Sequence, residues 1–149
     1  MQHEVRFVLV GGYAARVHGS PMVTEDVDIC LDFSPGNLLH LKNALNGLNP
    51  VHRLTPGKLP VVLNPENCVG LKNLYIQTSL GHLDCLSEVL SVGDYNECEK
   101  RSITRDLSGK PCKILSLDAL ITAKAALSRP RDRENVLHLK AIREKLQQN

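Results

Sequence analysis

The sequence predicts an α/β (α+β) domain with a mixed central sheet that is flanked by helices and followed by two C-terminal helices. Short apolar runs of strand length alternate with amphipathic stretches of helical period. A chain of 149 residues is also the size of one ordinary domain with a closed core. We expect a core over residues 1–115 and a helical extension over residues 116–149, together forming a single compact domain.

The first third of the chain predicts two strands with a brief helix between them. Residues 5–10 (VRFVLV) form a short apolar run that is typical of a buried strand. Residues 13–19 fit one or two helical turns ending at Gly19, and residues 26–33 (DVDICLDF) predict the second strand.

A longer helix and a loop follow. Ser34 can cap a helix and Pro35 suits its first position, while apolar residues recur at helical spacing up to Gly47, so residues 34–48 predict a helix. Residues 49–70 are rich in Pro and Gly, and we expect a loop there with at most a short strand at residues 60–63.

The second half predicts two hairpins and then two helices. Residues 74–89 indicate two short strands about a turn at residues 79–81, and residues 103–115 indicate a hairpin that turns at Ser108-Gly109. Residues 116–127 predict a helix capped by Ser116, and an amphipathic helix begins at Pro130.

Charge is distributed unevenly along the chain. Residues 1–99 hold six Lys and Arg against eleven Asp and Glu, whereas residues 100–149 hold twelve against five. This division suits an acidic metal site beside a basic surface for phosphates or nucleic acid, although an ordinary solvated helical face explains the basic half equally well.

The cysteines and the hydropathy exclude several classes of protein. An odd number of scattered cysteines without a C-x-x-C pair predicts reduced, mostly buried thiols rather than a disulfide framework or a zinc site. They are Cys30, Cys68, Cys85, Cys98 and Cys112. No run approaches the ~18 to 20 apolar residues of a membrane span, and the first residues do not resemble a signal peptide. We therefore expect a cytoplasmic protein without a membrane partner.

Acidic residues occupy one face of the predicted strand at residues 26–33. With a period of two, the apolar face is Val27, Ile29, Leu31 and Phe33, and the other is Asp26, Asp28, Cys30 and Asp32. Like charges on one face raise one another's pKa unless a cation lies between them, and hard divalent cations prefer such oxygen ligands. The alternative is a half-exposed edge strand whose polar face happens to be acidic.

Gly11 and Gly12 lie at the junction between the first strand and the first helix. Such a junction offers free backbone N–H groups without a Cβ to block a phosphate. A tight turn is the alternative. Together with the acidic strand, the pair predicts a phosphate site that faces metal-binding carboxylates.

Residues 11–28 (GGYAARVHGSPMVTEDVD) resemble the signature of the DNA polymerase β-type nucleotidyltransferase superfamily, in which a Gly-Gly or Gly-Ser and a short helix precede a D-x-D. The stretch is most similar to small bacterial nucleotidyltransferases, including abortive-infection toxins, whose pattern is G-G-x-A-x-x-x-H-G and then R-x-T-x-D-x-D. The matching residues are Gly11, Gly12, Ala14, His18, Gly19, Thr24, Asp26 and Asp28. Met22 departs from the pattern, because these relatives usually carry arginine there.

The resemblance implies the nucleotidyltransferase fold and a site for two Mg²⁺ ions, with Mn²⁺ as an alternative. Three carboxylates hold such ions, so the resemblance assigns Asp26, Asp28 and Asp84 as catalytic and metal-binding residues. Asp84 stands in the strand-like stretch GHLDCL. Glu88 is the rival for the third position, and an ordinary acidic residue at a hairpin is the other interpretation of Asp84.

The resemblance also implies a nucleotide-binding set. It consists of Gly11, Gly12, Ser20, Thr24 and Lys124. Residues 120–139 resemble a K-x-x-x-x-x-R-x-K-D stretch, in which Lys124 would contact the triphosphate or else be a solvated helical lysine. Arg129, Arg131 and Arg133 are expected to be surface charges, and Asp132 to orient the helix or a basic neighbour.

The implied activity is transfer of NMP from an NTP such as ATP to an unidentified hydroxyl acceptor on tRNA, a protein or a small-molecule antibiotic. A first alternative is a catalytically silent binding module of a toxin–antitoxin system. A second is an unrelated domain that binds nucleic acid through basic C-terminal helices, although 3% aromatic residues leave few stacking platforms. Relatives have a helix before the first strand and about four residues precede it here, so a second copy in a homodimer could cover that flank.

Overall fold

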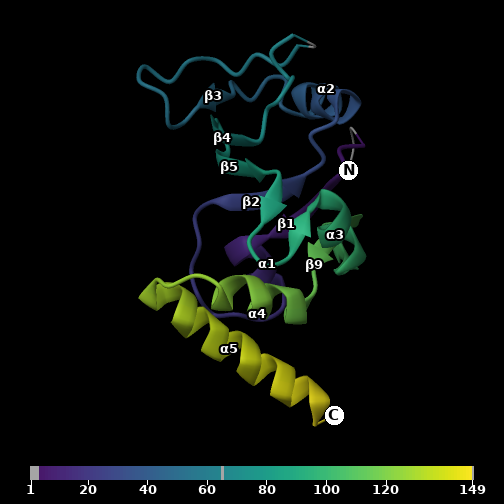
Figure 1. The fold of residues 1–149 in the computed structure, drawn as a ribbon, viewed down its shortest axis with the longest axis vertical. Coiled ribbons are helices and arrows are strands. Elements are labelled where there is room, and N and C mark those ends of the chain that lie inside the picture. The colour runs from purple at the N-terminus through teal and green to yellow at the C-terminus, as the bar shows by residue number, and fades with distance from the viewer. Residues whose placement is uncertain (1–3, 65, 149) are drawn as a thin grey trace.

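A seven-stranded mixed sheet forms the centre of the computed structural model, which describes residues 4–64 and 66–148 (Figure 1). Its strands, in spatial order, are β3 (Val51–His52), β4 (Asn73–Thr78), β5 (Gly81–Leu86), β2 (Val27–Leu31), β1 (Phe7–Val10), β9 (Lys110–Leu115) and β8 (Ser102–Leu107). The β2–β5 and β1–β9 pairs are parallel, and the other four pairs are antiparallel. The predicted mixed sheet is confirmed.

Helices cover the sheet at both ends of the molecule. They are α1 (Gly11–Val17), α2 (Pro35–Ala44), α3 (Tyr95–Lys100), α4 (Leu117–Ala125) and α5 (Pro130–Gln147). Figure 1 shows α4 and α5 at one end of the molecule, and α2 with the long loop around β3 at the other. The predicted cap of α4 is present, because the Ser116 hydroxyl accepts a hydrogen bond from the backbone N–H of Ala119 at 3.2 Å.

Most predicted elements are found within two residues of their expected ends. Both hairpins turn where expected, β4–β5 after Thr78 and β8–β9 at Ser108-Gly109. Residues 49–70, where a loop with at most a short strand at residues 60–63 was expected, hold β3 and a single bridge between Pro60 and Val51. The predicted strand pair over residues 74–89 ends earlier, at Leu86, and β6 (Glu88–Val89) forms a small hairpin with β7 (Gly93–Asp94), followed by α3. The sequence pattern carried no expectation for residues 90–102.

The acidic strand β2 is the central strand of the sheet. Ile29, Cys30 and Leu31 are at most 5% exposed, so both faces of the strand are buried at its carboxyl end. The edge-strand interpretation is therefore wrong. Because β2 lies between β1 and β5, its aspartates come next to residues from two other segments of the chain.

The C-terminal helices share the core of the sheet. Ala119, Leu120 and Ile121 of α4 are buried in one cluster with the β9 residues Ile114 and Leu115. All five cysteines are free and buried, as the sequence predicts. Within the described ranges, no helix combines the length and the apolar character that crossing a bilayer demands.

Candidate active site

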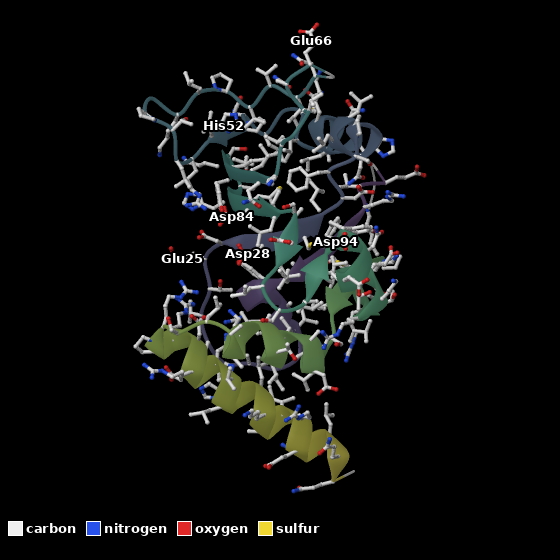
Figure 2. The ribbon with its side chains drawn as sticks, in the orientation of Figure 1. Glu25, Asp28, His52, Glu66, Asp84 and Asp94 are labelled. Carbon is white, nitrogen blue, oxygen red and sulfur yellow. The ribbon has the colours of Figure 1, made fainter. Side chains whose placement is uncertain are left out.

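Two predicted carboxylates lie side by side on neighbouring strands. Asp28 is the second residue of β2 and pairs in register with Asp84, the fourth residue of β5. Figure 2 shows both on the same side of the sheet, between the C-terminal helices and β3, which carries His52. Asp26 immediately precedes β2. The strand register, which local sequence does not give, thus brings Asp84 to Asp28, whereas the rival Glu88 lies beyond β5 in β6.

A side chain from β5 contacts Asp26, and a side chain from the loop after β3 contacts Asp84. The Oδ1 atom of Asp26 lies 3.0 Å from the Nδ1 atom of His82. A guanidinium nitrogen of Arg53 donates to Oδ1 of Asp84. Tyr75 holds Arg53 in place, since its carbonyl accepts from the Arg53 backbone N–H at 2.9 Å and its ring centroid lies 5.7 Å from the guanidinium carbon. Arg53 is thus a built-in cation of the acidic site.

The electrostatic environment of Asp28 opposes ionisation. Burial raises the pKa of Asp28 from 3.8 to about 6, and the neighbouring Asp84 carboxylate adds to the rise. Lys124 and Arg53 lower it in part, without compensating for the burial. Conversely, the hydrogen bond to Asp84 raises the pKa of the Arg53 guanidinium. A divalent cation between the two aspartates would relieve the same repulsion.

The glycine pair allows α1 to begin against the acidic strand. Val10 pairs with Asp28, so Gly11 leaves β1 directly beside that carboxylate. Gly11 has a φ of +68°, and a Cβ there would collide with the Asp28 carboxylate. A Cβ on Gly12 would meet the Thr24 Cβ and Oγ1 atoms at 2.7 Å. Both glycines are therefore required by close packing, and within the described chain no side chain caps the start of α1.

A polar cavity of about 370 Å³ opens beside Asp28. Five of the residues predicted from the sequence line it, and they are Gly12, Thr24, Asp26, Asp28 and Lys124. Arg129 and Arg131, which were expected to be surface charges, are exposed but also line the cavity, and Met22 contributes to its wall. The cavity therefore combines acidic residues from the sheet with basic residues from α4 and the start of α5.

A buried carboxylate organises the basic wall. Asp132 is 1% exposed and accepts two hydrogen bonds from Arg129, at 2.7 and 3.2 Å. Its Oδ1 atom lies 4.0 Å from the Lys124 Nζ atom. The hydrogen bonds from Arg129 lower the pKa of Asp132. Burial lowers the pKa of Lys124, while the negative charges of Asp132 and Asp28 raise it in part. The expectation that Asp132 orients a basic neighbour is confirmed.

Two predicted nucleotide-binding residues make contacts within the protein. The Ser20 hydroxyl is buried and donates to the Asn135 Oδ1 atom at 3.2 Å. In the part of the chain that the structure describes, Ser20 does not line the polar cavity, while its partner Asn135 does. The Thr24 hydroxyl lines the cavity and donates to the Asp26 carbonyl oxygen at 3.4 Å.

The oxygen atoms of the three aspartates suit a hard divalent cation, but two of these carboxylates are bonded to other side chains. Across residues 4–64 and 66–148, no group of three or more His, Cys, Asp or Glu side chains is arranged to hold a metal ion. Asp26 and Asp84 are each turned to a side-chain partner, His82 and Arg53. The carboxylate oxygens fit Mg²⁺ chemically, provided that His82 and Arg53 release Asp26 and Asp84.

The sequence did not indicate the role of Arg53. Arg53 comes from the long loop between α2 and β4, 31 residues before its partner Asp84, and no motif marks that loop. The Nε atom of Arg53 is buried and has no hydrogen-bond partner among the described residues. His82 had a signal, because the period-two pattern of β5 places it on the same face as Asp84.

Comparison with known proteins identifies a structure with the same fold. No family model and no curated protein matches the sequence. The structure is similar to the crystal structure of the lincosamide antibiotic adenylyltransferase LnuA in its lincomycin-bound form, with a TM-score of 0.55 and 16% sequence identity. The match covers 91% of this chain and 86% of that one. The chain therefore has the nucleotidyltransferase fold that the sequence predicts, while the toxin-like subgroup stays a prediction.

Proposed function

We propose that this protein is a metal-dependent nucleotidyltransferase that moves a nucleoside monophosphate from an NTP to a hydroxyl acceptor and releases pyrophosphate. The observation that carries the proposal is the in-register pair of Asp28 and Asp84, of which Asp28 lines a cavity that Lys124 also lines. The nucleotidyltransferase fold supports it, because the structurally similar LnuA is an adenylyltransferase.

The three carboxylates divide the chemistry. Asp26 and Asp28 would hold two Mg²⁺ ions, or Mn²⁺ in their place, and Asp84 would hold one of them. When bound, the ions supply Lewis-acid activation of the acceptor hydroxyl and neutralise the charge of the leaving pyrophosphate. Asp84 accepts the proton of the acceptor hydroxyl while the oxygen of that hydroxyl forms its bond to the α-phosphorus. The bond between the α-phosphorus and the β-phosphate oxygen breaks, and pyrophosphate leaves with that electron pair.

The basic wall of the polar cavity binds the triphosphate. Lys124 and the exposed Arg129 provide cationic donors that their shared partner Asp132 orients. Gly11 and Gly12 offer backbone N–H groups at the start of α1, and Thr24 offers a hydroxyl. Ser20 acts through Asn135, since its own hydroxyl is bonded to that side chain.

A small molecule is the first acceptor to test. The structurally similar LnuA is described as acting on a lincosamide antibiotic, a small molecule. The acceptor would approach from the side of Asp84 and Arg53, where the carboxylate that takes its proton lies. Transfer RNA and protein are the other acceptor classes that the activity allows, and a toxin-like enzyme would use one of them.

The decisive experiment follows label from an NTP to an acceptor. Each of the four NTPs, labelled at the α-phosphate, is incubated with the protein and Mg²⁺ in the presence of lincosamides, aminoglycosides, total tRNA or cell protein. We expect transfer to one acceptor class, and its loss in Asp26→Asn/Asp28→Asn. Asp106→Asn, an exposed change on β8, is the matched control and should leave transfer intact. If none of the four NTPs reacts or binds in the presence of Mg²⁺, the proposal is wrong.

One observation favours a second candidate, a catalytically silent binding module. Arg53 and His82 engage two of the three carboxylates, as cationic or hydrogen-bonding partners would in a site without metal. The two candidates differ in metal binding. Titration with Mn²⁺, followed by its electron paramagnetic resonance, should show binding that Asp28→Asn abolishes in an enzyme, and no such binding in a silent module.

A further inference from the structure

A second cavity adjoins the polar cavity at the candidate active site. It has a volume of about 240 Å³ and shares Asp28, Lys124 and Arg129 with the polar cavity. Gly11, which packs against the Asp28 carboxylate, also lines it. The two cavities therefore adjoin at these three shared side chains.

The walls of this second cavity, called here the apolar cavity, are mostly aliphatic. They come from the ends of β1 and β5, from the turn after β6 and from α4. The residues that matter here are Val10, Leu86, Leu90, Leu120, Ala123 and Leu127. Apart from the three shared residues, Glu88 is the one charged residue of the described chain in its lining. Such walls accept an uncharged, apolar group and disfavour a phosphate.

We propose that the apolar cavity is the subsite for the nucleobase of the NTP whose triphosphate lies in the polar cavity. This inference rests on the proposed function. One continuous molecule must place phosphates against Lys124 and Arg129 and an uncharged heterocycle nearby, and the apolar cavity begins at these same two side chains. Asp84 is not among the described residues that line the apolar cavity. The acceptor, whose proton Asp84 would take, therefore approaches from another side.

The lining also determines how selective the subsite is. Among the described residues that line the apolar cavity, no side chain carries a hydroxyl or an amide, and Glu88 is the one side chain outside the three shared residues that can hydrogen-bond to the edge of a base. A base would be held between aliphatic side chains, and such walls discriminate poorly between heterocycles of similar size. We expect the affinities for ATP, GTP, CTP and UTP to lie within about tenfold of one another.

Filling the apolar cavity from α4 tests the inference. Ala123 is 9% exposed and lines the cavity, whereas Ala125, two residues along the same helix, is exposed. Isothermal titration in the presence of Mg²⁺ compares ATP with inorganic tripolyphosphate, which has no base. We expect Ala123→Leu to weaken ATP binding by about tenfold or more and to leave tripolyphosphate binding within about twofold. The matched control Ala125→Leu should leave both unchanged.

A second variant tests the inference even if Ala123→Leu does not fold. Leu90 lines the cavity and is 59% exposed, so Leu90→Asn makes the wall polar without opening the core. It should weaken ATP binding by about threefold to tenfold and spare tripolyphosphate. Unchanged ATP binding in both variants overturns the inference and leaves the cavity to an apolar part of the acceptor. Equal weakening of both ligands in both variants also overturns it, and a wild-type protein that binds neither ligand contradicts the proposed function itself.

Discussion

Asp28 lies in an environment that favours its protonated form. The folded chain raises its pKa from 3.8 to about 6, chiefly through burial and then through Asp84. Between about pH 4 and pH 6 the folded state therefore binds more protons at this position than the unfolded state. The free energy of unfolding falls as the pH rises through this window, and the full penalty is present above about pH 6.

The variant Asp28→Asn should remove that penalty. We expect it to be more stable than the wild type by about 1–3 kcal/mol at pH 7.5, with a smaller difference at pH 4.5. Urea denaturation at both pH values measures the two free energies. A variant that is less stable at pH 7.5, or a difference that does not change with pH, would contradict the stated environment of Asp28.

Gly11 should not tolerate a side chain. Its φ of +68° is strained for alanine, and the added Cβ would collide with the Asp28 carboxylate. Gly11→Ala should therefore lower the free energy of unfolding by about 1–3 kcal/mol. The control is Gly36→Ala in the first turn of α2, where a Cβ meets no atom of the described chain within 4 Å. That change should be neutral or stabilise the protein by up to about 1 kcal/mol in the same denaturation assay.

Arg53 should compete with a divalent cation for Asp84. If the proposed metal site is correct, Arg53→Gln removes the built-in cation and should tighten Mn²⁺ binding by about threefold to tenfold. Lys58→Gln, an exposed change on the same loop, serves as control and should leave Mn²⁺ affinity unchanged. Weaker Mn²⁺ binding in Arg53→Gln would mean that Arg53 orients Asp84 for the metal instead.

At the scale of elements, the contact between α4 and α5 shapes the basic wall of the polar cavity. Asp132, in the first turn of α5, is the buried carboxylate that ties Arg129 to that helix and faces Lys124 of α4. The two helices also share apolar contacts, since Val136 and Leu139 of α5 are buried in the common core. The position of Lys124 above the sheet thus depends on how α5 begins.

Asp132→Asn should loosen this junction. The neutral amide loses the charge-assisted bonds from Arg129, and we expect the free energy of unfolding to fall by about 1.5–3 kcal/mol. Glu134→Gln, an exposed change two residues further along α5, should alter it by less than about 0.5 kcal/mol. Chemical denaturation of both variants checks the difference, and equal effects would show that the Asp132 network does not hold the helices.

At the scale of the whole molecule, we predict that the helical extension and the sheet unfold as one cooperative unit. Buried residues of α4, among them Ala119 and Leu120, pack in the same cluster as Ile114 and Leu115 of β9. Removing residues 116–149 would expose this apolar surface to water, at a cost of about 25 cal/mol for each Å².

We therefore expect one unfolding transition for the full chain and none for residues 1–115 alone. Far-UV circular dichroism and tyrosine fluorescence should give coincident urea curves for the full chain. The shortened chain should show a broad, non-cooperative change and poorly dispersed amide resonances. A shortened chain that unfolds cooperatively would establish residues 1–115 as an independent domain.

Local patterns explain how much of this architecture the sequence could predict. Period-two runs and turn residues located both hairpins, and Ser116 and Pro130 located the starts of α4 and α5, because each signal acts within a few residues. Residues 90–102 have no comparable period, so β7 and α3 were not anticipated. At residues 60–63, where at most a short strand was expected, the apolar run pairs at a single position, with Val51.

The sequence by itself determined the order of elements and the presence of an acidic strand after a glycine junction, since both are encoded in contiguous residues. The tertiary structure alone decided which groups meet there. It set Asp84 beside Asp28 through the β2–β5 register, brought Arg53 to Asp84 from a loop 31 residues away, and placed the polar and apolar cavities on either side of shared walls at Asp28 and Lys124. Such contacts depend on how strands pair and helices pack across long separations, and no local period specifies them.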